Sequence, residues 1–266
     1  EKPTADRLKT LALATALCFA GPLGANPQDA RIVAGQASLE QVGKTLTIRN
    51  TPGAVINWQS FNIGRDEITR FIQQSAQSQV LNRVTGVDPS QILGRLQSNG
   101  RVLLVNPNGV FFGPGSQVDV AGLVVSTLSL SNADFLAGRM RFHDGDQAGG
   151  IRNEGTIRTA VGGEVVLIAP KVDNSGLIHS PEGKILLAAG RSVEIADLDH
   201  PDIRVEVSNN AQQAVNLGTL IGNQVSLIGG LVRNSGVIQA TTARVGENGR
   251  IQLRAGSKIV TTGDSV

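Results

Sequence analysis

The stretch NEGTIRTAVGGEVVLIAPKVDNSGLI, residues 153–178, holds one complete repeat of the chain and the start of the next. Its opening motif, Asn-x-Gly with Ile or Leu at the fifth position, begins at Asn153, Asn174 and Asn234, and a degenerate copy begins at Asn216. The intervals between these asparagines are 21, 42 and 18 residues, close to multiples of a unit of about 20 residues, a repeat length found in solenoid proteins. Each unit contains an apolar strand, a turn with Asn and Gly, and a second short strand. The sequence therefore predicts the stacked coils of an all-β parallel β-helix.

The recurring Asn and Gly mark the predicted corner of each coil. Both residue types tolerate left-handed backbone conformations, and we expect them to adopt these conformations at the corners. Asn side chains at equivalent corners are also placed to hydrogen-bond from one coil to the next. These corner residues are therefore expected to hold the stack together.

The rest of the chain, from Arg31 on, is a series of short β-type segments separated by Gly, Asn, Pro and Ser. Residues 44–50, 224–230 and 250–256 alternate apolar and polar side chains with the period of two that is typical of strands. Almost no segment has a helical period, and residues 73–84 are the most compatible with a helix. The spaced leucines of leucine-rich repeats are missing, and the aromatic marks expected in each blade of a propeller are not found, which leaves the β-helix as the favoured fold.

A β-helix exposes unpaired strand edges and an open apolar core at its first coil, so it needs a cap. Residues 36–62 are the least repeat-like strand region and are the predicted N-terminal β cap, with Trp58 and Phe61 as its plugs. At the other end, residues 250–263 stop within the repeat pattern and carry no polar cap. We therefore expect further coils beyond Val266 in the natural protein.

The composition limits the classes of partner. The chain has 266 residues, a formal net charge of +2, 40% hydrophobic and 3% aromatic residues, 32 Gly and no Tyr. The apolar side chains are mostly Val, Ile, Leu and Ala, which suit thin and closely packed layers. No basic block is present, so nucleic acid is not an expected partner.

Residues 1–25 have the layout of a secretory signal peptide. Lys2, Arg7 and Lys9 precede a ten-residue apolar run and then small residues, with cleavage expected after Ala25. The run is too short to span a bilayer, and a buried N-terminal helix is the alternative. Glu1 is not a natural start, so this peptide is expected to be incomplete. Removal of residues 1–25 would leave a mature domain, residues 26–266, without cysteine and therefore without disulfides.

The ionisable residues do not form a recognisable catalytic or metal-binding pattern. The three histidines are dispersed, and solvent-exposed roles are expected for them. The densest acidic cluster, ADLDHPD at residues 196–202, is interpreted as a solvated face, with calcium binding or general acid/base chemistry as the alternative. A second acidic, glycine-rich loop, residues 143–150, resembles no calcium-binding motif. No catalytic residue, cofactor or metal site is therefore predicted. The residues considered are His143, His179, His200, Asp144, Asp146, Asp197, Asp199 and Asp202.

A tight turn is predicted in RVLLVNPNGVFFGPG, residues 101–115. Two short apolar strands, residues 101–105 and 110–112, flank the sequence NPNG. Pro107 presets φ for a turn position, and Asn108 and Gly109 are residue types that tolerate positive φ. Without further context this segment is only a turn.

Longer blocks around this turn resemble a known family. Residues 80–132, which include LNRV, NPNG and VAGLVVSTLSLSN, closely resemble the N-terminal secretion domain of two-partner-secretion exoproteins, also named the filamentous-haemagglutinin N-terminal or haemagglutination activity domain. Residues 54–64 are similar to an upstream block of that family, and residues 196–220 are similar to a segment of its high-molecular-weight adhesin branch. The resemblance covers roughly residues 30–266. A second family motif, NPNL, is absent from residues 70–84.

The resemblance implies a right-handed parallel β-helix with an N-terminal cap and a non-enzymatic role in secretion. The domain would cross the inner membrane through the general secretion machinery. In the periplasm, POTRA domains of a dedicated outer-membrane transporter would recognise it and lead a large adhesin-like or haemagglutinin-like protein to the surface of a Gram-negative bacterium, where the domain folds. The residues to which the resemblance assigns transporter recognition or early folding are Asn106, Pro107, Asn108, Gly109, Leu81, Asn82, Arg83 and Val84.

Other functions remain open at this stage. Many β-helices cleave acidic polysaccharides with carboxylates and basic residues along one groove, although basic partners at repeat spacing are missing here. A module that binds glycans directly is the third possibility, although few aromatic side chains are available to stack on sugars. The passenger that follows the domain would determine any host-surface ligand, and it could be an adhesin, a cytolysin, a contact-dependent toxin or a haem scavenger.

Overall fold

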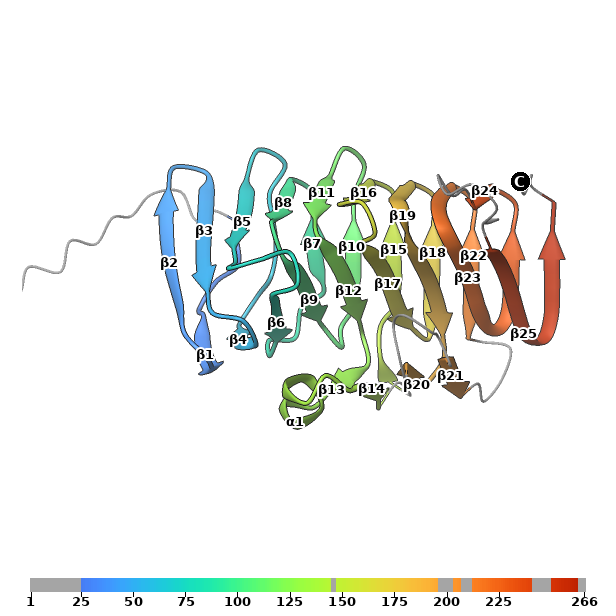
Figure 1. The fold of residues 1–266 in the computed structure, drawn as a ribbon, viewed down its shortest axis with the longest axis horizontal. Helices are drawn as coiled ribbons and strands as arrows, with labels where there is room; N and C mark the ends of the chain where they lie inside the picture. Colours follow the sequence, from blue (N-terminus) through green and yellow to red (C-terminus); the bar gives the residue numbers. More distant parts are fainter. Residues whose placement is uncertain (1–24, 145–146, 196–202, 207–211, 241–249, 263–266) are drawn as a thin grey trace, which may run out of the picture.

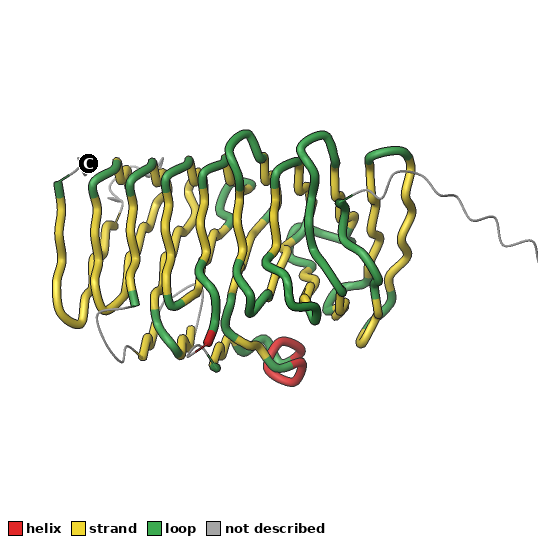
Figure 2. Tube along the Cα trace, turned by 180° about the vertical axis from the view of Figure 1, so that it is seen from behind, coloured by secondary structure: helices red, strands yellow, loops and turns green. Residues whose placement is uncertain are grey.

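Parallel strands stacked along one axis form the body of the protein (Figures 1 and 2). This computed structural model describes residues 25–144, 147–195, 203–206, 212–240 and 250–262. Each coil of the stack after the first contributes one strand to each of three parallel sheets, which we call the first, second and third faces. The prediction of an all-β parallel β-helix is therefore confirmed.

The three faces follow one another around each coil. The first face contains β3 (Thr45–Asn50), β5 (Ile68–Ile72), β8 (Arg95–Ser98), β11 (Gln117–Val120), β16 (Thr156–Thr159), the starts of β19 (Leu177–Ala189) and β23 (Thr219–Asn234), and β24 (Val237–Ala240). The second face contains β4 (Ala54–Trp58), β6 (Gln79–Val84), β9 (Arg101–Val105), β12 (Gly122–Ser126), β17 (Glu164–Ala169), later parts of β19 and β23, and the start of β25 (Arg250–Thr261). The third face contains β7 (Ser90–Ile92), β10 (Val110–Phe112), β15 (Ile151–Asn153), β18 (Lys171–Asn174), β22 (Gln213–Asn216) and the ends of β23 and β25.

Antiparallel strands close the N-terminal end of the stack, as predicted for the cap. β2 (Ala37–Val42) pairs antiparallel with β3, and β1 (Arg31–Ala34) pairs antiparallel with β4. Trp58 and Phe61 are 0% and 1% exposed in the adjoining core, and their rings meet edge to face with centroids 5.8 Å apart. This geometry is one of the favoured arrangements of aromatic pairs.

Four buried asparagines form a ladder of side-chain hydrogen bonds inside one corner of the stack. Asn153 Nδ2 donates to Asn174 Oδ1 at 2.8 Å, Asn174 Nδ2 donates to Asn216 Oδ1 at 2.8 Å, and Asn216 Nδ2 donates to Asn234 Oδ1 at 2.7 Å. All four side chains are at most 1% exposed. The predicted coil-to-coil bonding of the corner asparagines is confirmed.

The expected left-handed corner conformation is wrong, because none of the four Asn-x-Gly motifs has a positive φ at its Asn or Gly. The glycines are required for a different reason. A Cβ on Gly176 would lie 2.1 Å from Gly155 O, and a Cβ on Gly218 would lie 2.1 Å from Gly176 O. The corners therefore stack so closely that only glycine fits.

Two excursions leave the stack between the second and third faces. The first contains β13 (Ser129–Leu130), α1 (Asn132–Leu136) and β14 (Met140–His143), and the second contains β20 (Ser192–Ile195) and β21 (Ile203–Glu206). Together they form a four-stranded antiparallel sheet on one side of the solenoid (Figure 1). The second excursion explains the interval of 42 residues, because β18 pairs directly with β22 and Asn174 with Asn216. That interval is one coil with an insertion and is not two coils.

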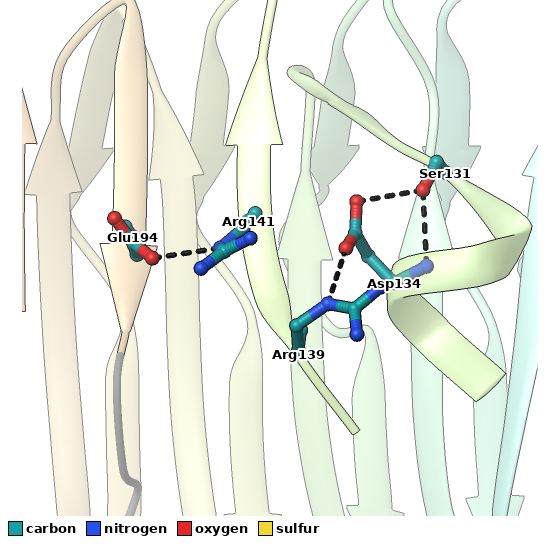
Figure 3. A network of polar contacts seen from close by, with 5 residues as sticks. All are labelled: Ser131, Asp134, Arg139, Arg141 and Glu194. Carbon is teal, nitrogen blue, oxygen red and sulfur yellow. Dashed lines mark hydrogen bonds and ion pairs between the residues drawn. The ribbon is translucent and has the colours of Figure 1, made fainter. Parts of the chain in front are cut away.

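The excursion sheet covers the outer side of the second face with a second apolar core. Buried side chains from the second face, including Leu103 and Val124, pack with Phe135, Phe142 and Val193 from the excursions. Strands buried on both sides read as continuous apolar runs, which accounts for the sequences RVLLV and EVVLIA. Polar contacts secure the outside of this layer (Figure 3). Asp134 Oδ2 accepts from Ser131 and Oδ1 accepts from Arg139, both at 2.7 Å, and Arg141 pairs with Glu194 at 2.7 Å.

Helix is confined to the excursion among the described residues. The five-residue α1 is N-capped by Ser131, whose side chain accepts from Asp134 N. The stretch of residues 73–84, the most compatible with a helix in the sequence, contains β6. No described helix has the length and apolar character needed to cross a membrane. Residues 1–24 of the predicted signal peptide lie outside the described residues. The same holds for Asp146, Asp197, Asp199, His200 and Asp202.

Candidate recognition site

The NPNG turn, residues 106–109, joins β9 on the second face to β10 on the third face. Gly109 N donates to Asn106 O at 3.1 Å, which closes the turn, and Asn108 N donates to Asn106 Oδ1 at 3.0 Å. Gly109 has a φ of 118°, in the region that favours glycine, whereas Asn108 has no positive φ. The turn prediction is therefore correct, with the left-handed residue placed at Gly109 alone.

Asn106 anchors this turn to the preceding coil. Its side chain is fully buried, and Nδ2 donates to Asp88 O and to Ser90 Oγ, both at 3.0 Å. Pro107 and Asn108 are exposed, and Asn108 Nδ2 donates to Gly86 O at 2.9 Å. Within the motif, the two central residues are thus the ones that a partner of the folded domain can reach.

The LNRV block, residues 81–84, faces the two cores of the protein. Asn82 lies inside the stack, where Oδ1 accepts from Trp58 Nε1 at 2.9 Å and Nδ2 donates to Leu103 O at 3.2 Å. Leu81, Asn82 and Val84 are at most 3% exposed. No partner can touch these three side chains while the domain is folded, so their role in the folded state is structural.

Arg83 fastens the first excursion to the stack. Its Nη1 donates to Asn132 Oδ1 at 2.8 Å, and its Nη2 donates to Leu130 O at 2.6 Å. Partial burial lowers the pKa of the Arg83 guanidinium from its usual value. This contact could not be predicted from the sequence, because the two segments are separated by about fifty residues.

The structure brings the predicted residues together on three consecutive coils. β4, which carries Trp58, pairs with β6, and β6 pairs with β9, which leads into the NPNG turn. The return of the first excursion, Gly149 and Gly150, then covers the turn from the other side. Gly149 N donates to Pro107 O at 2.7 Å, and Val110 N donates to Gly150 O at 3.1 Å. The two adjacent glycines were the sequence signal for this close approach.

The described residues offer little for catalysis. His143 Nδ1 lies 2.6 Å from Asp144 Oδ2, and both side chains are exposed. His179 lies on the outer side of the first face, beside Arg158 on the neighbouring strand. In the part of the chain that the structure describes, no three His, Cys, Asp or Glu residues are placed to hold a metal ion.

A family model described as TPS secretion domain matches residues 24–266. The chain belongs to this family. Membership implies an exported protein of the Gram-negative cell surface with a dedicated outer-membrane transporter as its partner. These inferences agree with the resemblance of the LNRV and NPNG blocks.

Solved structures agree with the family and the fold. The HMW1 secretion domain from Haemophilus influenzae is 34% identical, with a TM-score of 0.83 over 90% of this chain and 64% of that chain. The filamentous hemagglutinin secretion domain is 18% identical, with a TM-score of 0.57 over 91% of this chain and 98% of that chain, and it supports the fold alone.

Among curated proteins, two sequences named heme/hemopexin-binding protein from Haemophilus influenzae are similar to this chain. One is 33% identical over 236 residues, which is 85% of this chain and 24% of that protein. The other is 39% identical over 106 residues, which is 39% of this chain and 11% of that protein. The chain thus spans about a quarter or less of these relatives. Neither the relatives nor the family are named for an enzymatic activity.

Proposed function

We propose that this domain directs an adhesin-like or haemagglutinin-like exoprotein to its outer-membrane transporter, whose POTRA domains recognise it in the periplasm, and that it folds as a β-helix outside the cell. The observation that carries the proposal is the match of a secretion-domain family over residues 24–266. The N-terminal layout of a signal peptide supports passage through the inner-membrane secretion machinery.

The two motifs would act at different stages. The side chains of Leu81, Asn82 and Val84 are accessible only in an unfolded chain, which would also offer strand edges for β-augmentation by the POTRA domains. In the folded domain Asn82 bonds to Trp58, and Arg83 holds the first excursion in place. The NPNG turn sets the register between β9 and β10 and still exposes Pro107 and Asn108. Recognition and folding thus share the same residues.

Co-expression of the chain with its cognate two-partner-secretion transporter tests the proposal. The domain is expected in the medium only when the transporter is present, and a transporter without its POTRA domains should abolish export. Retention of export without any transporter would contradict the proposal.

The Asn108→Ala and Gly109→Val variants separate recognition from folding. Asn108→Ala removes the hydrogen bonds from Asn108 Nδ2 to Gly86 O and to Asn106 Oδ1 and preserves the backbone, whereas Gly109→Val strains a residue with a φ of 118°. If the Asn108→Ala/Gly109→Val protein keeps its fold and its transporter affinity while export persists, NPNG has no recognition role.

The passenger class is a second proposal, favoured by the names of the curated relatives. We propose that the passenger following this domain binds haem or haem-carrying protein, as the names of those two relatives state for them. Absorbance titration of the full-length exoprotein with haem, with the isolated domain as control, tests it. A featureless titration of the full-length protein would refute it.

A further inference from the structure

Glu67 is a buried carboxylate that makes no ion pair among the described residues. It lies just before β5 and is 9% exposed. Its Oε2 accepts from Gly64 N and its Oε1 accepts from Ala25 N, both at 2.8 Å. Both donors are uncharged backbone amides. Because burial of a charge is costly unless an opposite charge accompanies it, a cation at this place would stabilise the fold.

The charged side chains on the segments around Glu67 do not supply this cation. Lys44, just before β3, pairs with Asp66 at 3.0 Å, and their side chains are 67% and 78% exposed. Arg95 of β8 contacts Glu67 through the backbone, where its N donates to Glu67 O at 2.9 Å. All the charged residues on these segments are exposed; they are Asp29, Lys44, Arg65, Asp66 and Arg95.

Asn26, the first residue of the predicted mature chain, is fixed beside Glu67. Asn26 is 5% exposed, its Nδ2 donates to Lys44 O at 3.2 Å, and its Oδ1 accepts from Thr69 Oγ1 at 2.8 Å. Pro27, the next residue, is also buried. Because β3 and β5 belong to different coils, these bonds hold the start of the mature chain against two coils at once.

Cleavage of the predicted signal peptide would bring a cation to this place. The sequence predicts cleavage after Ala25, which replaces the amide at Asn26 with an α-ammonium group. Consecutive residues are spaced about 3.8 Å apart, so the new group lies one residue from the position at which Ala25 N donates to Glu67 Oε1. Among the described residues the Asn26 backbone nitrogen donates no hydrogen bond, so it is free to turn toward Glu67.

We propose that Glu67 binds the α-ammonium group that signal-peptide cleavage creates on Asn26, and that this ion pair stabilises the N-terminal cap. The inference rests on the proposed function, because it requires the predicted removal of residues 1–25. It adds that the folded domain distinguishes a processed chain from an unprocessed one. A chain that still carries those residues has an uncharged amide at the same place.

The titration of an α-amino group gives this ion pair a specific signature. An unperturbed α-amino group has a pKa of about 7.7–8.0, and pairing with a carboxylate in the folded state raises it. The pair therefore stabilises the fold below the unfolded pKa, and its contribution is lost as the pH rises through the folded pKa. The chain has no Tyr, and its single Cys lies within residues 1–25. In the mature chain the α-amino group is thus the group expected to titrate between the ordinary pKa values of His and Lys.

Two forms of the chain measure the effect. Removal of a fused carrier by a site-specific protease leaves Asn26 as the first residue of one form and Leu23 as the first residue of the other. At pH 7 the form that begins at Asn26 is expected to melt about 3–6 °C higher, and this difference should disappear as the pH rises to about 10.

Glu67→Gln keeps a side-chain acceptor and removes the charge. In the form that begins at Asn26 it should abolish both the higher melting temperature and its alkaline loss, and in the longer form it should have a much smaller effect. Asp66→Asn is the matched control, since Asp66 is the exposed acidic neighbour and should shift either melting temperature by less than about 2 °C.

The outcomes separate this inference from the proposed function. Equal melting temperatures of the two forms at pH 7 would overturn the ion pair, and so would an unchanged alkaline loss in Glu67→Gln. If that variant does not fold, the pH dependence of the two wild-type forms decides alone. N-terminal sequencing of the chain exported in the co-expression experiment identifies the first residue. An exported chain that begins at Asn26 without the alkaline loss would overturn only the inference, whereas an exported chain that retains residues 1–25 would also contradict the signal peptide of the proposed function.

Discussion

Removal of one interior asparagine from the ladder should destabilise the domain strongly. Asn174→Ala breaks the bond from Asn153 Nδ2 and the bond to Asn216 Oδ1, both 2.8 Å long. It also leaves one donor and one acceptor buried without these partners. Each buried polar group left unsatisfied costs about 1–3 kcal/mol, and overlap of the terms gives an expected loss of about 3–5 kcal/mol in the free energy of unfolding.

The expected loss of stability depends on where the asparagine lies in the ladder. Asn234→Ala removes only the bond from Asn216 Nδ2, which also reaches Val237 O at 3.4 Å. Its expected cost is about 1–2 kcal/mol because only one group loses its partner. An interior asparagine should therefore matter at least twice as much as the terminal one.

Equilibrium unfolding in urea, followed by circular dichroism, measures these differences. Ser175→Ala is the control, since Ser175 is the exposed neighbour of Asn174 and should change the stability by less than about 0.5 kcal/mol. The slopes with denaturant must match for the comparison to hold. Equal losses for Asn174→Ala and Asn234→Ala, or a loss below 1 kcal/mol for Asn174→Ala, would refute the ladder as a main stabilising element.

Three further perturbations test other contacts. Gly176→Ala places a Cβ 2.1 Å from Gly155 O and should cost about 3 kcal/mol or more in unfolding free energy, measured by urea denaturation. Trp58→Phe removes the donor to Asn82 Oδ1 in the core and should cost about 1–3 kcal/mol by the same measurement. Bonds from Ser131 and Arg139 lower the pKa of Asp134, so its carboxylate stabilises the fold above the unfolded pKa of about 4, and this contribution is lost as the pH falls through the lower folded pKa. The melting-temperature advantage of the wild type over Asp134→Asn should therefore be full above pH 5 and shrink at lower pH.

Each of these perturbations has its own control. Gly162→Ala, where a Cβ has open space and only the φ of 74° opposes it, should cost less than Gly176→Ala, and equal costs would contradict close stacking as the cause. Trp58→Phe and Asn82→Ala should be non-additive in the double variant, and simple additivity would show that the two groups do not interact. A pH-independent difference between wild type and Asp134→Asn would contradict the role of the carboxylate.

The repeat motif predicted the fold because its chemistry is local. Alternating apolar residues and a recurrent Asn-x-Gly are sufficient to indicate strands, corners and stacking. The 42-residue interval was ambiguous, since an inserted excursion and an additional coil have the same length. The corner glycines were assigned to left-handed turns, whereas contacts with the neighbouring coil determine them, as at Gly176. A single sequence does not display those contacts.

The sequence indicates the second apolar core only in part. Runs such as residues 101–105 are apolar at every position after the first, which indicates burial on both sides. What covers the outer side could not be predicted, because α1 and β20 come from segments with weak patterns of their own. The contacts of Asn82 with Trp58 and of Arg83 with Asn132 could not be predicted either, because the partners are far apart in the sequence. Family motifs locate such residues without stating whether they face a partner or the core.

The four-stranded excursion sheet has a consequence for the order of events during export. β14 pairs with β20, so in the proposed export two segments about fifty residues apart would both have to emerge before the outer side of the second face is shielded from water. The coils that contain β9, β12 and β17 can stack earlier. Their outward side chains Leu103, Val124 and Val166 remain exposed to water until the excursion sheet covers them. If the domain folds during export as proposed, the emerging chain would expose this apolar face until the second excursion follows and would then bury it in one step. That step would oppose backward movement of the polypeptide, because such movement would again expose the whole apolar face to water.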